Sequence, residues 1–296
     1  MKVNEFQDYL RLQVRAVDRR LDELLPSSEI PPETLHRAMR HSVLAPGKRI
    51  RPILCLASCR ALGGEGKKAL DSACALEIIH AYSLIHDDLP AMDDDDLRRG
   101  RPACHKAFSE GTAILAGDAL LTLAFEIIAG DEQLSPLQSR HIIRELSQAA
   151  GWAGMVGGQE ADLRAEGRNL RPQELQSIHA RKTGALLTAA AVIGGRCADA
   201  GPGRIEELRI YGKKIGLAFQ IRNDILDVIG TEAEMGKTLG KDEKTAKATY
   251  PAVFGLETAR KKLKEATGAA VDALDDLGEE AEPLRRIAAY IGSRTH

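Results

Sequence analysis

The stretch IHDDLPAMDDDDLRRGRP, residues 85–102, holds six aspartates followed at once by arginines. It comes directly after CALEIIHAYSL, residues 74–84, an apolar run with helical spacing. Carboxylates at the end of an apolar helix are costly unless positive charge neutralises them. Mg²⁺ prefers oxygen ligands and commonly bridges carboxylates to phosphates, and arginines bind the same phosphates. The stretch therefore predicts a magnesium and phosphate site rather than a solvated acidic loop.

The bulk composition is that of a globular protein. Hydrophobic residues make up 44% of the 296 residues, and the formal net charge is −2. A disordered chain is less hydrophobic and a nucleic-acid binder is more basic, so we expect neither class. The five cysteines form no CxxC pair and are odd in number. This is typical of reduced thiols, and we expect a cytoplasmic protein.

Two segments bear on membrane targeting. The N-terminal 25 residues are studded with charge and contain no apolar core of a signal peptide. The apolar run at 112–129 contains Asp118 and Glu126, and acids at mid-membrane depth are costly. We therefore expect this run to be a buried helix, and we predict no membrane span.

Apolar residues recur at steps of three and four along most of the chain, which predicts helices. The first helix ends before Pro26, and a second begins after Pro31-Pro32 and reaches Val43. A further helix is expected at 53–62, and a separate long helix carries the chain to Leu89. The remaining helices are expected at 111–129, 137–155, 173–193, 204–229, 251–277 and 282–293. Period-two strand patterns are absent. With no break in composition, the sequence predicts an all-α, single-domain bundle of about ten or more helices spanning residues 1–296.

A second acidic motif, IRNDILD at residues 221–227, echoes the first. Both motifs put acids at the C-terminal end of an apolar helix. Asn223 and Asp227 are four residues apart, so they share one helix face. Two such helices facing each other would hold metal ions between them. In the first motif Asp93 follows Asp87 by six residues, so residues 90–92 must loop out for both acids to reach one ion.

These motifs, together with GKRIRP at residues 47–52, resemble those of the trans-isoprenyl diphosphate synthases, and the whole chain is similar to bacterial farnesyl diphosphate synthases. Further matching segments are HAYSLIHDDLPAMD at 80–93, LRRG at 97–100, GQ at 158–159, KTG at 182–184, FQIRNDILD at 219–227, GK at 236–237 and YPA at 250–252. The resemblance implies the isoprenoid synthase fold, with helices around a central active-site cavity. It also implies a condensation in which an allylic diphosphate ionises and isopentenyl diphosphate attacks the carbocation.

The resemblance assigns roles to individual residues. The metal ligands would be Asp87, Asp88, Asp93, Asn223, Asp224 and Asp227, and the ion Mg²⁺, with Mn²⁺ as the substitute. Arg98, Lys182 and Lys237 would bind the allylic diphosphate, and Thr183 and Gln220 would line the reacting centre; these five are the expected catalytic residues. Isopentenyl diphosphate would be held by Gly47, Lys48, Arg51, His80 and Arg99. The resemblance also implies a homodimer.

Two positions bear on rate and product length. The family usually has aspartate where this chain has Asn223, and an amide oxygen coordinates Mg²⁺ without a formal charge, so we expect weaker metal binding there. Tyr82 lies about 7–8 Å before Asp87 along a helix, because each residue rises about 1.5 Å. A phenol at that depth would form the floor of the cavity, with Ser83 leaving space above it. We predict the C15 product, (2E,6E)-farnesyl diphosphate, made from dimethylallyl and then geranyl diphosphate.

Other functions fit the sequence less well. A geranylgeranyl or geranyl diphosphate synthase would differ only in the depth of the pocket. A terpene cyclase would not need Lys48 and Arg51 for a second diphosphate, and a metal phosphohydrolase with a His86–Asp87 pair would leave the second motif unused. A non-catalytic partner subunit would fit the change to Asn223. A P-loop at Gly236-Lys237-Thr238 fails because no glycine occupies position 231 and no strand precedes it.

Overall fold

The computed structural model describes residues 3–168, 170–229 and 249–294, and it confirms the all-α fold. The α-helices are α1 (Val3–Leu24), α2 (Glu33–Val43), α3 (Ile50–Ala61), α4 (Leu70–Asp87), α5 (Cys104–Ala107), α6 (Glu110–Ala129), α7 (Pro136–Ala150), α8 (Met155–Leu163), α9 (Pro172–His179), α10 (Ala185–Cys197), α11 (Pro202–Ile229), α14 (Tyr250–Phe254), α15 (Leu256–Asp272) and α16 (Glu282–Ser293). Short helical turns are η1 (Gly66–Ala69), η2 (Ala180–Gly184) and η3 (Glu279–Ala281).

The structure departs from the expected elements at several places, and α5 and most of α8 were not expected. The strands β1 (Leu97–Arg98) and β2 (Arg101–Pro102) form a small antiparallel hairpin, although we expected none. Its turn is Arg99-Gly100, and both residues have positive φ, the conformation that a tight two-residue hairpin requires. The helix expected at 137–155 is interrupted over residues 151–154, and the one expected at 251–277 is broken at Gly255, where φ is 80°.

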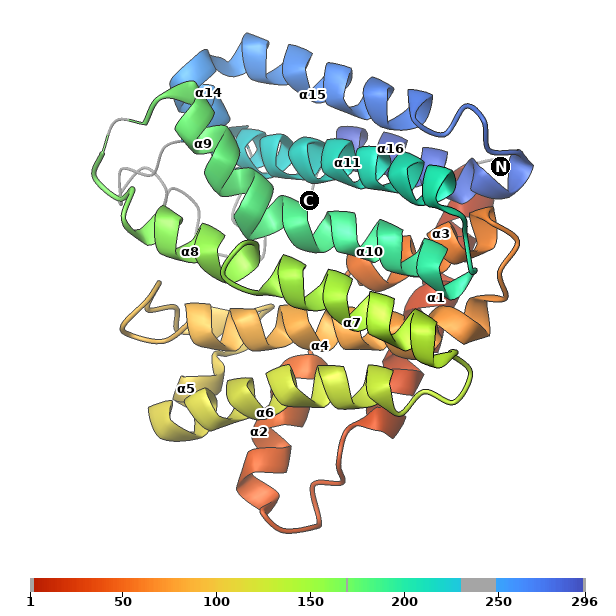
Figure 1. The fold of residues 1–296 in the computed structure, drawn as a ribbon. Helices are drawn as coiled ribbons and strands as arrows, with labels where there is room; N and C mark the ends of the chain where they lie inside the picture. The colour runs from red at the N-terminus through yellow and green to blue at the C-terminus, as the bar shows by residue number, and fades with distance from the viewer. Residues whose placement is uncertain (1–2, 169, 230–248, 295–296) are drawn as a thin grey trace.

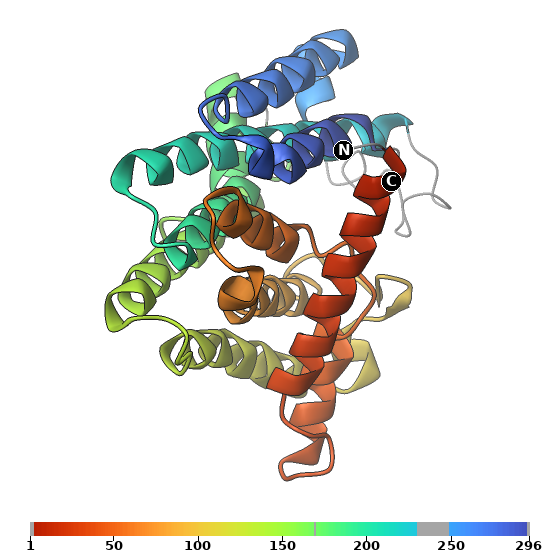
Figure 2. The same ribbon diagram turned by 90° about the vertical axis from the view of Figure 1, so that its right-hand side faces the viewer.

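The helices stack in layers. In Figure 1 the stack runs from α15 at the top through α11, α10 and α4 to α6 near the bottom. α10 packs against α3, α7 and α11, while α4 packs against α3 and α6. Turned by 90°, Figure 2 shows α1, in red, crossing the stack, where it contacts α3 and α4. Helices α3 and α4 therefore lie in the interior, enclosed on several sides.

The enclosed position of α4 explains its composition. Residues 72–79 are buried without interruption, including Glu77, so this helix is apolar on nearly every face. By contrast α1 covers the stack from outside and buries a single stripe that includes Phe6, Val17 and Leu21. One continuous hydrophobic cluster includes residues from α1 through α16. The interior helix α4 carries Asp87 to the end of this core.

Helix α6 is only partly the buried helix that we expected. Ser109 caps its first turn by accepting a hydrogen bond from Thr112 N over 3.1 Å. One face, which includes Leu120 and Ala124, is buried against its neighbours, but Ile114 and Leu115 are 45% and 59% exposed. By length and composition alone α6 could cross a membrane, but the core helices of globular proteins meet the same two criteria.

Candidate active site

A cavity of about 640 Å³ opens where α4, α8, η2 and α11 meet. The predicted site residues that line it are Arg51, His80, Tyr82, Ser83, Asp87, Lys182, Thr183 and Asn223. Those that do not line it are Gly47, Lys48, Asp88, Asp93, Arg98, Arg99, Gln220, Asp224 and Asp227, and Lys237 lies outside the described residues. A larger depression of about 1260 Å³ beside α7 and α11 is lined by none of the predicted residues.

The first acidic motif folds back on the end of α4. The helix ends at Asp87, and the chain then loops out and returns so that Asp93 N donates to the Asp87 carbonyl oxygen over 2.9 Å. A second return bond runs from Asp95 N to the Asp88 carbonyl oxygen over 3.2 Å. The loop at residues 90–92 thus brings Asp93 next to Asp87, as the spacing required.

Asp88 fastens the hairpin to the end of α4. It is 2% exposed, and Arg98 Nε donates to its two carboxylate oxygens over 2.9 and 3.2 Å. Arg98 Nη2 also contacts Asp88, and lies 3.2 Å from Asp95. A guanidinium and a carboxylate in this arrangement form a strong two-point contact. The structure therefore pairs these two predicted residues with each other, beside the cavity rather than in its wall.

The donor set fits a magnesium ion. Burial raises the pKa of Asp87 to about 6, although nearby Lys182 opposes this shift. A buried carboxylate with a raised pKa is one that lacks enough positive charge, which a bound cation would supply. Asp87 and Asn223 line the same cavity and offer oxygen atoms, the ligands that Mg²⁺ prefers. A different trio, Asp94, Asp96 and His105, has ligand atoms within 4.8 Å of one another, and it was not predicted.

The second acidic motif is linked to α14 and to the C-terminal end. Asp224 is 4% exposed, and its two carboxylate oxygens accept from Gln220 Nε2 at 2.8 Å and from Tyr250 N at 2.9 Å. Asn223 Oδ1 accepts a hydrogen bond from the Arg294 guanidinium, which also lies 4.3 Å from the centre of the Phe219 ring. The amide of Asn223 thus already has a cation beside it.

The turn η2 presents Lys182 and Thr183 to the cavity. It is a π-helical turn between α9 and α10, a feature that often marks functional sites. Lys182 Nζ lies 2.6 Å from Asp162 Oδ2 on α8. Gly158 allows α8 to approach so closely, because a Cβ there would lie 2.2 Å from Lys182 N.

A hydrogen-bond chain fixes the orientation of the Thr183 hydroxyl. The Asp224 carboxylate only accepts, so the Gln220 amide must donate to it through Nε2. Gln220 Oε1 then accepts from Thr183 Oγ1 over 2.9 Å. Because its hydrogen is committed to Gln220, the Thr183 oxygen keeps its lone pairs for the cavity that it lines.

Cations gather at the start of α3 and beside α4. Burial lowers the pKa of Arg51 to about 10, and burial with the nearby arginines lowers the pKa of His80 well below its usual value. The His80 ring is therefore neutral near pH 7. Partial burial and Arg294 lower the pKa of Lys48 to about 8. Arg99 approaches Gly47 so closely that a Cβ on the glycine would lie 2.7 Å from Arg99 Nη1.

Tyr82 closes one part of the cavity wall. It is 5% exposed, and its ring packs edge-on against His86 at 5.8 Å between centroids. His86 in turn lies 3.1 Å from the Ile114 carbonyl oxygen and fills the space that Gly117 leaves on α6. This packing braces the phenol.

Several residues in or beside the cavity were missed. Gln159 was quoted only as part of a matching segment, yet it lines the cavity, is 9% exposed, and finds no hydrogen-bond partner among the residues described. Phe219 was likewise quoted only as the first residue of the segment 219–227, yet it lines the cavity. Asp162, the partner of Lys182, has no motif around it that marks a role. Arg294 stands close to the end of the sequence, where only tertiary contact reveals its place beside Asn223. A buried, unpartnered amide is the signal that identifies Gln159.

Comparison with solved structures matches the whole fold. The FPP/GFPP synthase of Zymomonas mobilis superposes with a TM-score of 0.89 at 36% identity, covering 99% of this chain and 100% of that one. The geranylgeranyl pyrophosphate synthetase of Pyrococcus horikoshii superposes with a TM-score of 0.90 at 31% identity, with the same coverage.

Comparison of sequences names the family. The farnesyl diphosphate synthase of Geobacillus stearothermophilus is 46% identical over 98% of both chains. A chloroplastic heterodimeric geranylgeranyl pyrophosphate synthase large subunit 1 of Arabidopsis thaliana is 44% identical over 98% of this chain and 80% of its own. The family model "Polyprenyl synthetase" matches residues 32–282. With its acidic motifs and cations placed around one cavity, this chain belongs to the polyprenyl synthetase family and is a short-chain trans-prenyl diphosphate synthase.

Proposed function

We propose that this enzyme condenses isopentenyl diphosphate with dimethylallyl diphosphate and then with geranyl diphosphate, and releases (2E,6E)-farnesyl diphosphate. The observation that carries the proposal is Tyr82, a braced and buried phenol in the wall of the cavity that also holds Asp87. A chain that grows away from Asp87 would meet this ring. Relatives with farnesyl and with geranylgeranyl in their names match this chain about equally well, so the proposal of the shorter product rests on the ring.

The residues of the site divide the work. Lys182 and the nearby Asp87 end of α4 would receive the allylic diphosphate, while Arg51 and His80, which line the same cavity, would receive isopentenyl diphosphate. Magnesium, held by Asp87, Asp93 and Asn223, would supply the positive charge that the leaving diphosphate needs. The lone pairs of Thr183 would face the carbocation and stabilise it, since its hydrogen is committed to Gln220.

We further propose a single-domain homodimer of the cytoplasm. The continuous core from α1 to α16 supports one domain, and the five buried free cysteines support a reducing compartment. Ile114 and Leu115 of α6 and Val156 of α8 are exposed apolar side chains. They support the proposal of a homodimer in which a second copy covers them. Ile114 and Val156 also line the cavity, so a second copy there would close its wall.

The experiment that tests the proposal is an assay with magnesium, labelled isopentenyl diphosphate and either dimethylallyl or geranyl diphosphate, with products separated by chain length. We expect the C15 product from both allylic substrates. A C20 main product would keep the condensation but refute the tyrosine floor. The absence of product at every magnesium concentration, with activity restored only on mixing with a relative, would instead identify a partner subunit.

A further inference from the structure

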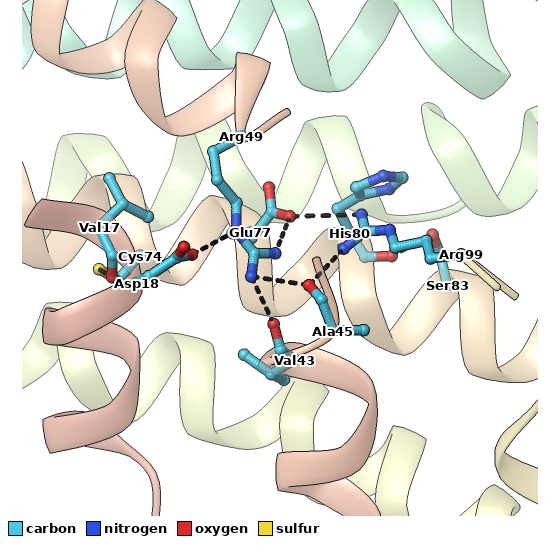
Figure 3. A network of polar contacts seen from close by, with 10 residues as sticks. All are labelled: Val17, Asp18, Val43, Ala45, Arg49, Cys74, Glu77, His80, Ser83 and Arg99. Atoms are coloured by element: carbon cyan, nitrogen blue, oxygen red, sulfur yellow. Dashed lines mark hydrogen bonds and ion pairs between the residues drawn. The ribbon is translucent and has the colours of Figure 1, made fainter. Parts of the chain in front are cut away.

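A buried ion pair lies behind the cations assigned to isopentenyl diphosphate. Glu77 of α4 and Arg49, the residue before α3, are 2% and 3% exposed. Arg49 Nη1 donates to Glu77 Oε1 over 2.7 Å (Figure 3). Two charges taken out of water are stabilising only where further hydrogen bonds and good geometry compensate. A pair in such a place therefore calls for a reason beyond stability.

Arg49 uses each of its guanidinium nitrogens. Its Nε donates to Asp18 over 2.7 Å, and its Nη2 donates to the carbonyl oxygens of Val43 at 2.9 Å and Ala45 at 3.0 Å. Its backbone is left-handed, with φ 49°, which turns the chain between α2 and α3. Arg49 therefore fastens the loop at residues 43–49 to the interior of the protein.

The same two acceptors also reach Arg99. Its Nη2 lies 3.5 Å from Glu77 Oε1, and its Nη1 lies 3.4 Å from the Ala45 carbonyl oxygen (Figure 3). Both Nη atoms of Arg99 are thus directed by oxygens that Arg49 holds in place. Glu77 also supplies negative charge beside three arginines, of which Arg49 is buried and Arg51 and Arg99 are half-buried, because Arg51 feels its charge as well.

We propose that Glu77 is a positioning residue for the condensation: held by Arg49, its carboxylate orients Arg99 for isopentenyl diphosphate. The inference rests on the proposed function and adds a residue to it. Glu77 does not touch substrate in this arrangement; it acts through Arg99. The Asp87 end of the same helix, to which the allylic diphosphate is assigned, lies more than two turns from Glu77, so we expect the effect to fall mainly on isopentenyl diphosphate.

The first test is Glu77→Gln, which keeps the shape and removes the charge. We expect KM for isopentenyl diphosphate to rise about tenfold, as for loss of a charge-assisted contact, with KM for geranyl diphosphate changed less than about twofold. Glu77→Gln also removes the repulsion between the carboxylate and the diphosphate, and this second effect would lower KM for isopentenyl diphosphate. A KM for isopentenyl diphosphate that falls or stays the same would overturn the proposal.

The matched control is Asp71→Asn on the same helix. Asp71 also pairs with an arginine, since Arg20 Nε lies 2.7 Å from its Oδ1, but it has no contact with Arg99 among the residues described. We expect it to leave both KM values within about twofold of the wild type. If Glu77→Gln does not fold, Glu77→Asp keeps the charge and shortens the side chain. It should still raise KM for isopentenyl diphosphate selectively, and equal rises for both substrates would contradict the inference.

A second test separates positioning from general damage. In an Arg99→Ala background Glu77→Gln should change KM for isopentenyl diphosphate by less than about twofold, because the residue through which it acts is gone. A full effect in that background would show that Glu77 acts otherwise. If the wild type makes no product, the proposed function fails; the positioning role is then tested by calorimetric binding of inorganic pyrophosphate without metal. Glu77→Gln should weaken that binding, and an unchanged affinity would refute the role.

Discussion

At the scale of single residues, Tyr82 sets a limit on product length. Tyr82→Ala should shift the main product from C15 to C20 or longer, because the ring that ends the cavity is removed. Truncating a buried aromatic ring also costs about 3–5 kcal/mol of unfolding free energy, so thermal unfolding must be followed alongside the products. Tyr82→Phe is the control, since it keeps the ring and should keep C15. An unchanged product from the alanine variant would remove Tyr82 as the floor.

Lys48 should make the activity of the enzyme fall as the pH becomes alkaline. Its pKa is lowered to about 8 by partial burial and by Arg294, so the ammonium group of the free enzyme loses its proton above that pH. If Lys48 binds isopentenyl diphosphate, kcat/KM for this substrate should fall by about tenfold between pH 7.5 and 9.5, the loss of one charge-assisted hydrogen bond. Lys48→Arg should flatten the profile, because a guanidinium stays charged. A profile that is the same in both proteins would exclude Lys48 as its cause.

Asp87, Lys182 and Asn223, which line the cavity, stand in motifs that could be singled out in the sequence, whereas Asp162 and Arg294 beside them stand in none. Glu77 could not be predicted, although CALEIIHAYSL contains it: a single acid in an apolar run has no marked role until its partner is known. That partner, Arg49, lies 28 residues away. The direction of the Thr183 hydrogen bond likewise depends on Gln220 and Asp224 of α11, which only tertiary packing brings to Thr183.

At the scale of elements, periodicity predicted where helices lie but not where they are interrupted. The apolar spacing that predicts α1 and α11 reflects the face that each helix buries, which is a local property of the sequence. The π-helical turn η2 has no such signature, because α9 and α10 share one continuous apolar pattern. The gap at residues 151–154 and the hairpin turn at Arg99-Gly100 follow from glycines, and only the tertiary contacts show which glycines interrupt an element.

Near the C-terminal end of α11 this chain has Asn223 where the family usually has aspartate, and the effect of this difference on magnesium binding is measurable. Asn223→Asp should lower the magnesium concentration for half-maximal rate by about three- to tenfold, because a carboxylate adds full negative charge to the metal site. Arg294, which already donates to position 223, would compete for that charge and limit the gain. Calorimetric titration of magnesium in the presence of inorganic pyrophosphate gives a readout independent of turnover. Asn4→Asp on the exposed side of α1 is the control. An unchanged magnesium requirement would show that the amide suffices.

At the scale of the whole molecule, the exposed apolar face of α6 predicts association. The wild type should elute with twice the 32.1 kDa mass of one chain in light scattering. Leu115→Arg should yield monomers, since a buried unpaired charge at a subunit interface is costly. Leu12→Arg is the matched control, because Leu12 of α1 is 62% exposed and Leu115 is 59% exposed. We expect this control to leave the dimer intact. Ile114 lies in the cavity wall beside Leu115, so the monomer should also lose activity. A fully active Leu115→Arg monomer would separate the cavity from the interface, and a Leu115→Arg dimer would place the interface elsewhere.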